Sequence, residues 1–93
     1  MTVKYSKQYL HKLEDLMAET DYILRYEKGN FKSGYCILNS KKVAIVNKYF
    51  THEGKINCLI DILKSIEVNA DKLSSKNKTL FLELSQTDLK IWQ

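Results

Sequence analysis

The chain contains no proline and only three glycines among its 93 residues. It also has no low-complexity run and no internal repeat, so the sequence offers no segment that resembles a linker between domains. A chain of this length can bury one hydrophobic core but not two. We therefore predict a single domain over residues 1–93, which excludes a site in a cleft between two domains of the same chain.

Long hydrophobic runs are absent as well. A membrane helix needs about 20 apolar residues in succession, and no such run occurs. The first ten residues, MTVKYSKQYL, have no apolar stretch between their lysines and do not resemble a signal peptide. Apolar residues make up 44% and charged residues 28% of the chain, which is typical of globular proteins. We expect a soluble cytoplasmic protein.

Cysteine and histidine are scarce, with two residues of each type. Cys36 and Cys58 have no CxxC spacing and no neighbouring histidine cluster, so we expect two reduced, mostly buried thiols. A catalytic thiol would need a histidine that lowers its pKa, and only the fold could bring one close. A small enzyme that uses Cys36, or a pocket formed on folding, is therefore one alternative function.

The segment His52-Glu53 resembles the beginning of the zinc-hydrolase motif His-Glu-x-x-His. That motif needs two imidazoles one helical turn apart to hold the same metal. Here Ile56 stands where the second histidine would be, and His11 belongs to a different predicted helix. We therefore predict an ordinary helix start, no cofactor, no metal ligand and no catalytic residue, and hence a protein that is not an enzyme.

Hydrophobic spacing predicts three helices. The first covers residues 6–19 with Ser6 as its N-cap, and the second begins after Thr51 and closes at residues 69–71. The third follows Ser74 or Ser75, and an apolar tail follows it. Their predicted buried residues recur at helical intervals: Tyr9, Leu13, Leu16 and Met17; Ile56, Leu59, Ile60, Leu63 and Ile66; Leu80, Phe81 and Leu84.

Between the first two helices, three short runs have the periodicity of β-strands: residues 22–27, 34–38 and 42–47. The turn formers at residues 39–41 predict a tight hairpin between the last two. The expected fold class is α+β, with the order α-β-β-β-α-α. The expected architecture is a three-stranded antiparallel meander with helices packed on one face.

A sheet covered by helices on one face leaves its other face open. The resulting surplus of apolar and aromatic surface predicts a non-enzymatic protein–protein interaction module, either a homodimer or a binder of another protein. If the first strand turns Ile23, Arg25 and Glu27 away from the helices, these residues lie on the open face. The candidate interface residues are Tyr35, Ile37, Ile45 and Trp92.

Arginine is nearly absent, because the net charge of +4 comes from fourteen lysines and the single Arg25. An excess of lysine favours solubility or loose electrostatic attraction over specific reading of nucleic acid. Lysines and aromatic residues nevertheless alternate around the predicted strands, so a nucleic-acid-binding module is another alternative function. The candidate anion or nucleic-acid contacts are Arg25, Lys28, Lys32, Lys41, Lys42 and Lys48.

Four segments together resemble a family of small uncharacterised bacterial proteins of the kind found in Bacteroidota. They are Arg25-Tyr26-Glu27-Lys28-Gly29-Asn30-Phe31, Gly34-Tyr35-Cys36, Val46-Asn47-Lys48 and the helix over residues 53–63. The resemblance covers residues 25–84 and leaves out the first helix and the tail. It implies a bacterial cytoplasmic protein, and because the family has no established activity it transfers no catalytic residue.

Overall fold

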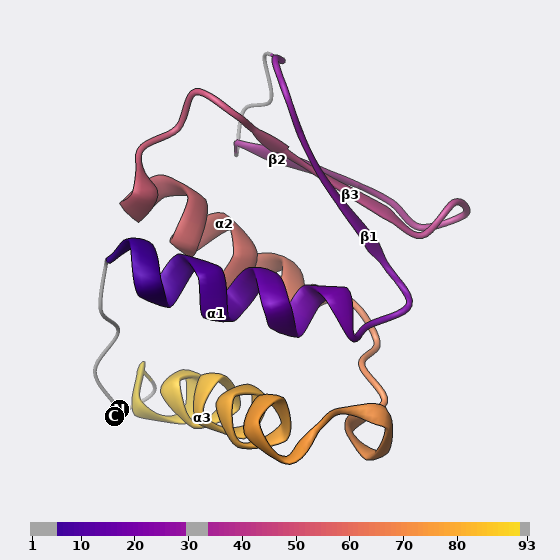
Figure 1. Ribbon diagram of the computed structural model, residues 1–93, viewed down its shortest axis with the longest axis vertical. Helices are drawn as coiled ribbons and strands as arrows, with labels where there is room; N and C mark the ends of the chain where they lie inside the picture. The colour runs from indigo at the N-terminus through magenta and orange to yellow at the C-terminus, as the bar shows by residue number, and fades with distance from the viewer. Residues whose placement is uncertain (1–5, 30–33, 92–93) are drawn as a thin grey trace.

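A computed structural model describes residues 6–29 and 34–91, without the side chains of residues 85–91. Within these residues the chain forms a small α+β domain with three α-helices and a three-stranded mixed sheet (Figure 1). The elements are α1 (Lys7–Ala18), β1 (Ile23–Glu27), β2 (Tyr35–Leu38), β3 (Val43–Asn47), α2 (His52–Ser65), the short 3₁₀ helix η1 (Ala70–Lys72) and α3 (Ser75–Ile91).

The helices begin where the sequence predicts. Ser6 Oγ accepts a hydrogen bond from the Tyr9 N–H at 3.1 Å, and Thr51 Oγ1 accepts one from the Gly54 N–H at 3.1 Å. Each hydroxyl satisfies a backbone donor that the first turn of a helix leaves unpaired. The second helix ends earlier than predicted, at Ser65, and the chain then runs to η1 before α3 begins.

The predicted antiparallel meander is wrong, because the strand order is β1-β3-β2 and β1 runs parallel to β3. β2 and β3 do form the predicted antiparallel hairpin. β3 occupies the centre because it is the most apolar strand, with Ala44 and Val46 fully buried. β1 carries two charged residues and therefore suits an edge position, where their side chains stay partly exposed.

The helices form two layers below the sheet rather than one (Figure 1). α1 and α2 pack against each other and against the sheet, and α3 packs on the side of this pair that faces away from the strands. The expectation that helices cover one sheet face therefore holds for α1 and α2. Among residues 6–29 and 34–91, no helix is long and apolar enough to cross a lipid bilayer.

The core lies between the sheet and the two helices that cover it. Leu13, Leu16, Ile56 and Leu59 have no exposed surface. Leu80 and Leu84 of α3 are also buried, as predicted. Since both faces of the α1–α2 pair are covered, this pair supplies most of the buried apolar area, which is the main source of stability in a small domain.

Candidate interaction surface

One face of the sheet is not covered by α1 or α2, and we call it the open face. Side chains alternate between the two faces of a strand, and the fully buried Ala44 and Val46 identify the face that the helices cover. The strand register then assigns eight residues to the open face: Ile23, Arg25, Glu27, Cys36, Leu38, Val43, Ile45 and Asn47. Ile23 is 62% exposed and Leu38 is 39% exposed, so the open face presents apolar surface to solvent.

Of the eight residues assigned to the open face, only Arg25 and Glu27 are charged. Their side chains form an ion pair within β1, with Arg25 Nη2 2.6 Å from Glu27 Oε2. Both side chains are partly exposed, so this pair contributes at most about 1 kcal/mol to stability. The open face is therefore electrically neutral overall and carries one charge of each sign along the edge strand.

The predicted interface residues do not share one surface. Tyr35 and Ile37 lie on the helix-covered face and pack against the core, whereas Ile45 lies on the open face. Trp92 lies outside the described residues. Ile23 lies on the open face, as it would if the first strand turned Ile23, Arg25 and Glu27 away from the helices. Leu38 and Val43 also lie there and were not among the predicted interface residues, because strand alternation assigns them only once the register is known.

The outer edge of β1 borders a groove of about 480 Å³ between this strand and α1. Tyr26 closes its floor, because its hydroxyl donates a 2.5 Å hydrogen bond to Glu14 Oε2 of α1. Burial raises the pKa of Tyr26 far above its usual value, and the hydrogen bond to the Glu14 carboxylate is the second cause. Lys55 Nζ lies 5.1 Å from the centre of the Tyr26 ring. Tyr26 is thus held in place from both helices.

The candidate lysines lie at two opposite ends of the sheet. Lys28 and Lys48 follow β1 and β3, whereas Lys41 and Lys42 precede β3, and a five-residue strand is about 16 Å long. Lys42 also pairs with Asp21 at 3.8 Å. Lys32 lies outside the described residues, and Arg25 is paired with a carboxylate. The described lysines therefore form no single basic patch beside the strands.

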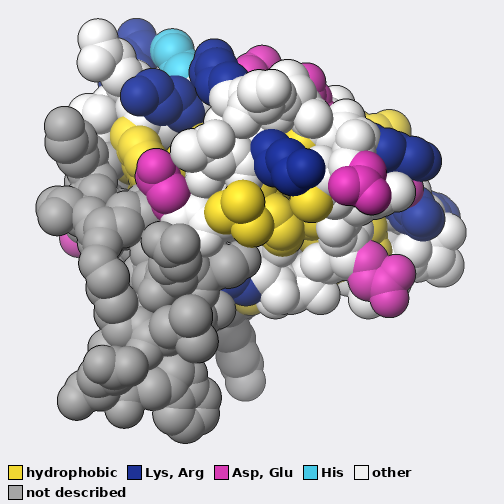
Figure 2. All heavy atoms as spheres, turned by 90° about the horizontal axis from the view of Figure 1, so that it is seen from below, with side chains coloured by type: hydrophobic (Ala, Val, Ile, Leu, Met, Phe, Trp, Pro, Cys, Tyr) yellow, Lys and Arg dark blue, Asp and Glu magenta, His cyan; other side chains and the backbone are white. Residues whose placement is uncertain are grey.

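The side of the molecule formed by α3 has a mixed surface (Figure 2). Small apolar areas alternate there with Lys and Arg side chains and with Asp and Glu side chains. Positive charge does not gather into one stripe on the visible part of this side. A nucleic-acid backbone would need such a stripe.

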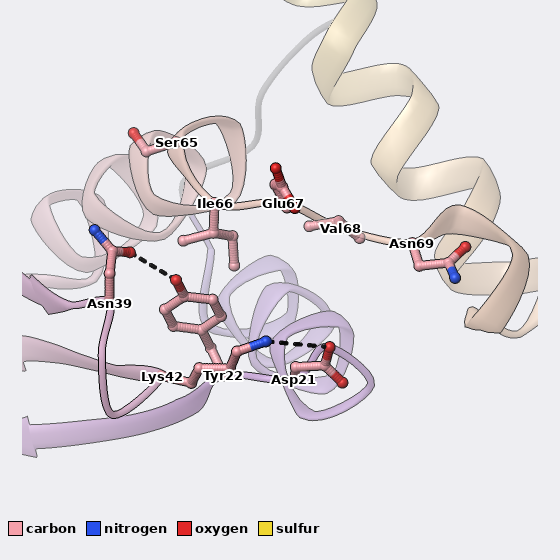
Figure 3. Close-up of a pocket in the computed structure, with 9 residues that line it drawn as sticks. All are labelled: Asp21, Tyr22, Asn39, Lys42, Ser65, Ile66, Glu67, Val68 and Asn69. Carbon is pink, nitrogen blue, oxygen red and sulfur yellow. Dashed lines mark hydrogen bonds and ion pairs between the residues drawn. The ribbon is translucent and has the colours of Figure 1, made fainter.

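A hollow of about 650 Å³ lies between the α1–β1 connection, the β2–β3 hairpin and the end of α2 (Figure 3). Four of its polar side chains are paired with one another. The Tyr22 hydroxyl donates to Asn39 Oδ1 at 2.6 Å, and Lys42 pairs with Asp21 across its lower rim. These two pairs join the hairpin to the α1–β1 connection and engage four of the polar side chains that line the hollow.

The two thiols have different environments. Cys58 is 4% exposed, and burial, with a smaller effect of Asp61, raises its pKa. A raised pKa keeps this thiol protonated at neutral pH, which is the opposite of what a catalytic nucleophile needs. Cys36 lies on the open face and is partly exposed. His11 and His52 are both exposed, on α1 and at the first turn of α2.

We expect a thiol reagent such as DTNB to label Cys36 rapidly and Cys58 at least about tenfold more slowly in the native protein. Cys58 reacts only when the core opens and the thiol ionises. The Cys36→Ser variant should lose the fast phase and keep the slow one, and denaturation should make both thiols equally accessible. Two fast thiols in the native protein would contradict the described burial of Cys58.

Within the described part of the chain, no three His, Cys, Asp or Glu side chains are grouped so as to hold a metal ion. Comparison with protein-family models, with curated proteins and with solved structures finds no match to this chain. The function must therefore be inferred from the uncovered side of the sheet, the β1 edge and the charges that the strands carry.

Proposed function

We propose that this chain is a non-enzymatic protein-interaction module that homodimerises through the uncovered side of its sheet. The observation that carries this proposal is the apolar surface of the open face, above all Ile23, which is 62% exposed on an edge strand. Uncovered apolar surface of this kind marks interaction sites in small proteins. The open face carries one charge of each sign, so it can contact the same face of a second copy without net electrostatic repulsion.

Two observations favour this function over the alternatives. The described lysines that would contact nucleic acid are divided between two ends of the sheet, and Cys36 lies on the open face whereas His11 and His52 lie on α1 and α2. Neither arrangement supports a basic binding track or an activated nucleophile. The bacterial origin, the cytoplasmic location and the family resemblance stay predictions from the sequence.

Self-association is tested by replacing Ile23 with lysine. We expect the wild type to show a molar mass that rises from monomer to dimer with concentration in light scattering after size-exclusion chromatography. Ile23→Lys should raise the dimer dissociation constant at least about tenfold, because the interface would then have to desolvate an ammonium group.

Leu82→Lys is the matched control. Leu82 is 50% exposed on α3, so the variant has the same change of charge and a similar change of apolar surface. It should dimerise like the wild type, and circular dichroism should show both variants folded. A wild type that stays monomeric at every accessible concentration would contradict the proposed function.

A further inference from the structure

We propose that the second copy adds to the free edge of β1 as an antiparallel strand, so that Arg25 of each copy faces the partner's Glu27. This inference rests on the proposed homodimerisation and places the contact at the β1 border of the open face, where Ile23 lies. The two three-stranded sheets would then form one continuous six-stranded sheet, and the two open faces would lie side by side on the same surface.

The backbone of β1 has groups free for such pairing. The Ile23 N–H donates to the Lys42 carbonyl at 2.9 Å, and the Glu27 carbonyl accepts from the Lys48 N–H at 3.1 Å. Alternate residues of a strand direct their backbone groups to opposite sides, so Ile23, Arg25 and Glu27 bond towards β3. The N–H and C=O groups of Leu24 and Tyr26 therefore point to the outer edge, where no described strand pairs with them.

A two-fold axis through Tyr26 gives a register in which Arg25 and Glu27, the two charged residues of β1, each face an opposite charge. Tyr26 then faces the partner's Tyr26 in a hydrogen-bonded pair, because both residues point their backbone groups outward. Arg25 faces the partner's Glu27, and Glu27 faces the partner's Arg25. These are non-hydrogen-bonded pairs, in which Cα atoms are only about 4.5 Å apart and opposite charges attract most strongly.

The neighbouring registers place like charges together. An axis through Arg25 makes this residue face the partner's Arg25, and an axis through Glu27 makes the two Glu27 carboxylates face each other. An axis through Leu24 sets Glu27 opposite the partner's Asp21. Like charges directly opposite each other destabilise a strand pair. Of the registers centred on residues 24–27, the one centred on Tyr26 is therefore the one that the charges favour.

The groove between α1 and β1 adds apolar area to this contact. The partner's strand would lie along its rim, where Tyr22 and Leu24 contribute to the lining. The exposed α1 residue at this groove is the small Ala18, which leaves room for a second backbone. The self-complementary charges identify a second copy, rather than an unrelated peptide, as the occupant.

Charge reversal tests the register. Arg25→Glu and Glu27→Arg each create two repulsive pairs in a homodimer, so each variant alone should raise the dimer dissociation constant at least about tenfold in sedimentation velocity. The double variant Arg25→Glu/Glu27→Arg restores both pairs and should dimerise within about threefold of the wild type. An equimolar mixture of the two single variants should form a heterodimer, visible by native mass spectrometry.

Lys41→Glu is the control, since it makes the same change of net charge as Arg25→Glu on the exposed hairpin. It should dimerise like the wild type. A wild-type dimer that neither single variant weakens would overturn the proposed strand pairing and leave homodimerisation through the open face. A monomeric wild type would overturn the proposed function together with this inference. A mixture that yields no heterodimer would likewise overturn the register centred on Tyr26.

Discussion

Replacing Gly34 with alanine is expected to destabilise the protein by about 2–5 kcal/mol, which combines a left-handed backbone penalty with overpacking. Gly34 has a φ of +87°, a conformation that residues with a side chain rarely adopt. A Cβ atom at this position would stand 2.2 Å from Phe50 Cε2 and 3.1 Å from Cys58 Sγ. The ring of Phe50 and the backbone at the start of β2 would both have to move.

The midpoint of urea unfolding measures this effect, and Phe50→Ala separates its two causes. In a Phe50→Ala background the clash is removed, so Gly34→Ala should cost only the backbone part, about 1–2 kcal/mol. Gly54→Ala is the matched control. Its Cβ atom would stand 2.9 Å from Phe50 Cδ2, but Gly54 does not have a positive φ. Because Gly54 lies in α2, the higher helix propensity of alanine offsets part of the cost. Equal costs of Gly34→Ala in both backgrounds would contradict the role of the Phe50 ring.

Replacing Asn77 with aspartate is expected to cost about 3–5 kcal/mol at pH 7, the range for an uncompensated buried charge. Asn77 is 1% exposed at the contact between α3 and α1. Its Nδ2 group donates to Glu19 Oε1 at 2.9 Å and to Asp15 Oδ2 at 3.3 Å. A third carboxylate would remove both hydrogen bonds and repel both acids, and Lys76, 3.7 Å from Asp15, would compensate only in part.

The pH dependence of this cost has a definite sign. Burial and the two carboxylates would raise the pKa of the new aspartate in the folded protein above about 3.9, its usual value. The electrostatic part of the cost is therefore absent below about pH 3, where the group is protonated in both states, grows as the pH rises from about 3.9 to the folded pKa, and is constant above it. Urea unfolding between pH 3 and pH 7, about the range over which the aspartate titrates, measures this difference.

Asn69→Asp is the matched control for this experiment. Asn69 is exposed and caps η1 through its side-chain oxygen, which accepts from the Asp71 N–H. Aspartate caps helices as well as asparagine does, so stability should change by less than about 0.5 kcal/mol. A loss in Asn77→Asp that is no larger than in Asn69→Asp would contradict the described burial of Asn77.

The contact around Asn77 also explains how α3 is attached. Glu19, at the end of α1, accepts from the Ser74 N–H at 2.9 Å as well as from Asn77. Both hydrogen bonds lower the pKa of Glu19, and the bond from Asn77 has the larger effect. Stability from this carboxylate is therefore present above its usual pKa of about 4.5 and is lost as the pH falls through the lowered value.

The sequence by itself determined the helices, their caps and the approximate strands, because these features depend on neighbours within one or two turns. Ser6 and Thr51 cap helices in any fold that follows them with amphipathic segments. Local alternation also placed Ile23, Arg25 and Glu27 on one face of their strand, but which face the helices cover depended on the tertiary structure. The tight hairpin between β2 and β3 could be predicted because its turn residues are consecutive.

Only the tertiary structure decided how distant segments meet. The place of β3 between β1 and β2 depends on which strand gains most from having a neighbour on both edges, and that requires a comparison of all three strands. In the resulting sheet Tyr35 and Ile37 point towards the helices, whereas Ile45 lies on the open face. The packing of Gly34 against Phe50 and the attachment of Asn77 to Glu19 join residues far apart in the chain, so their roles arise only when the core closes.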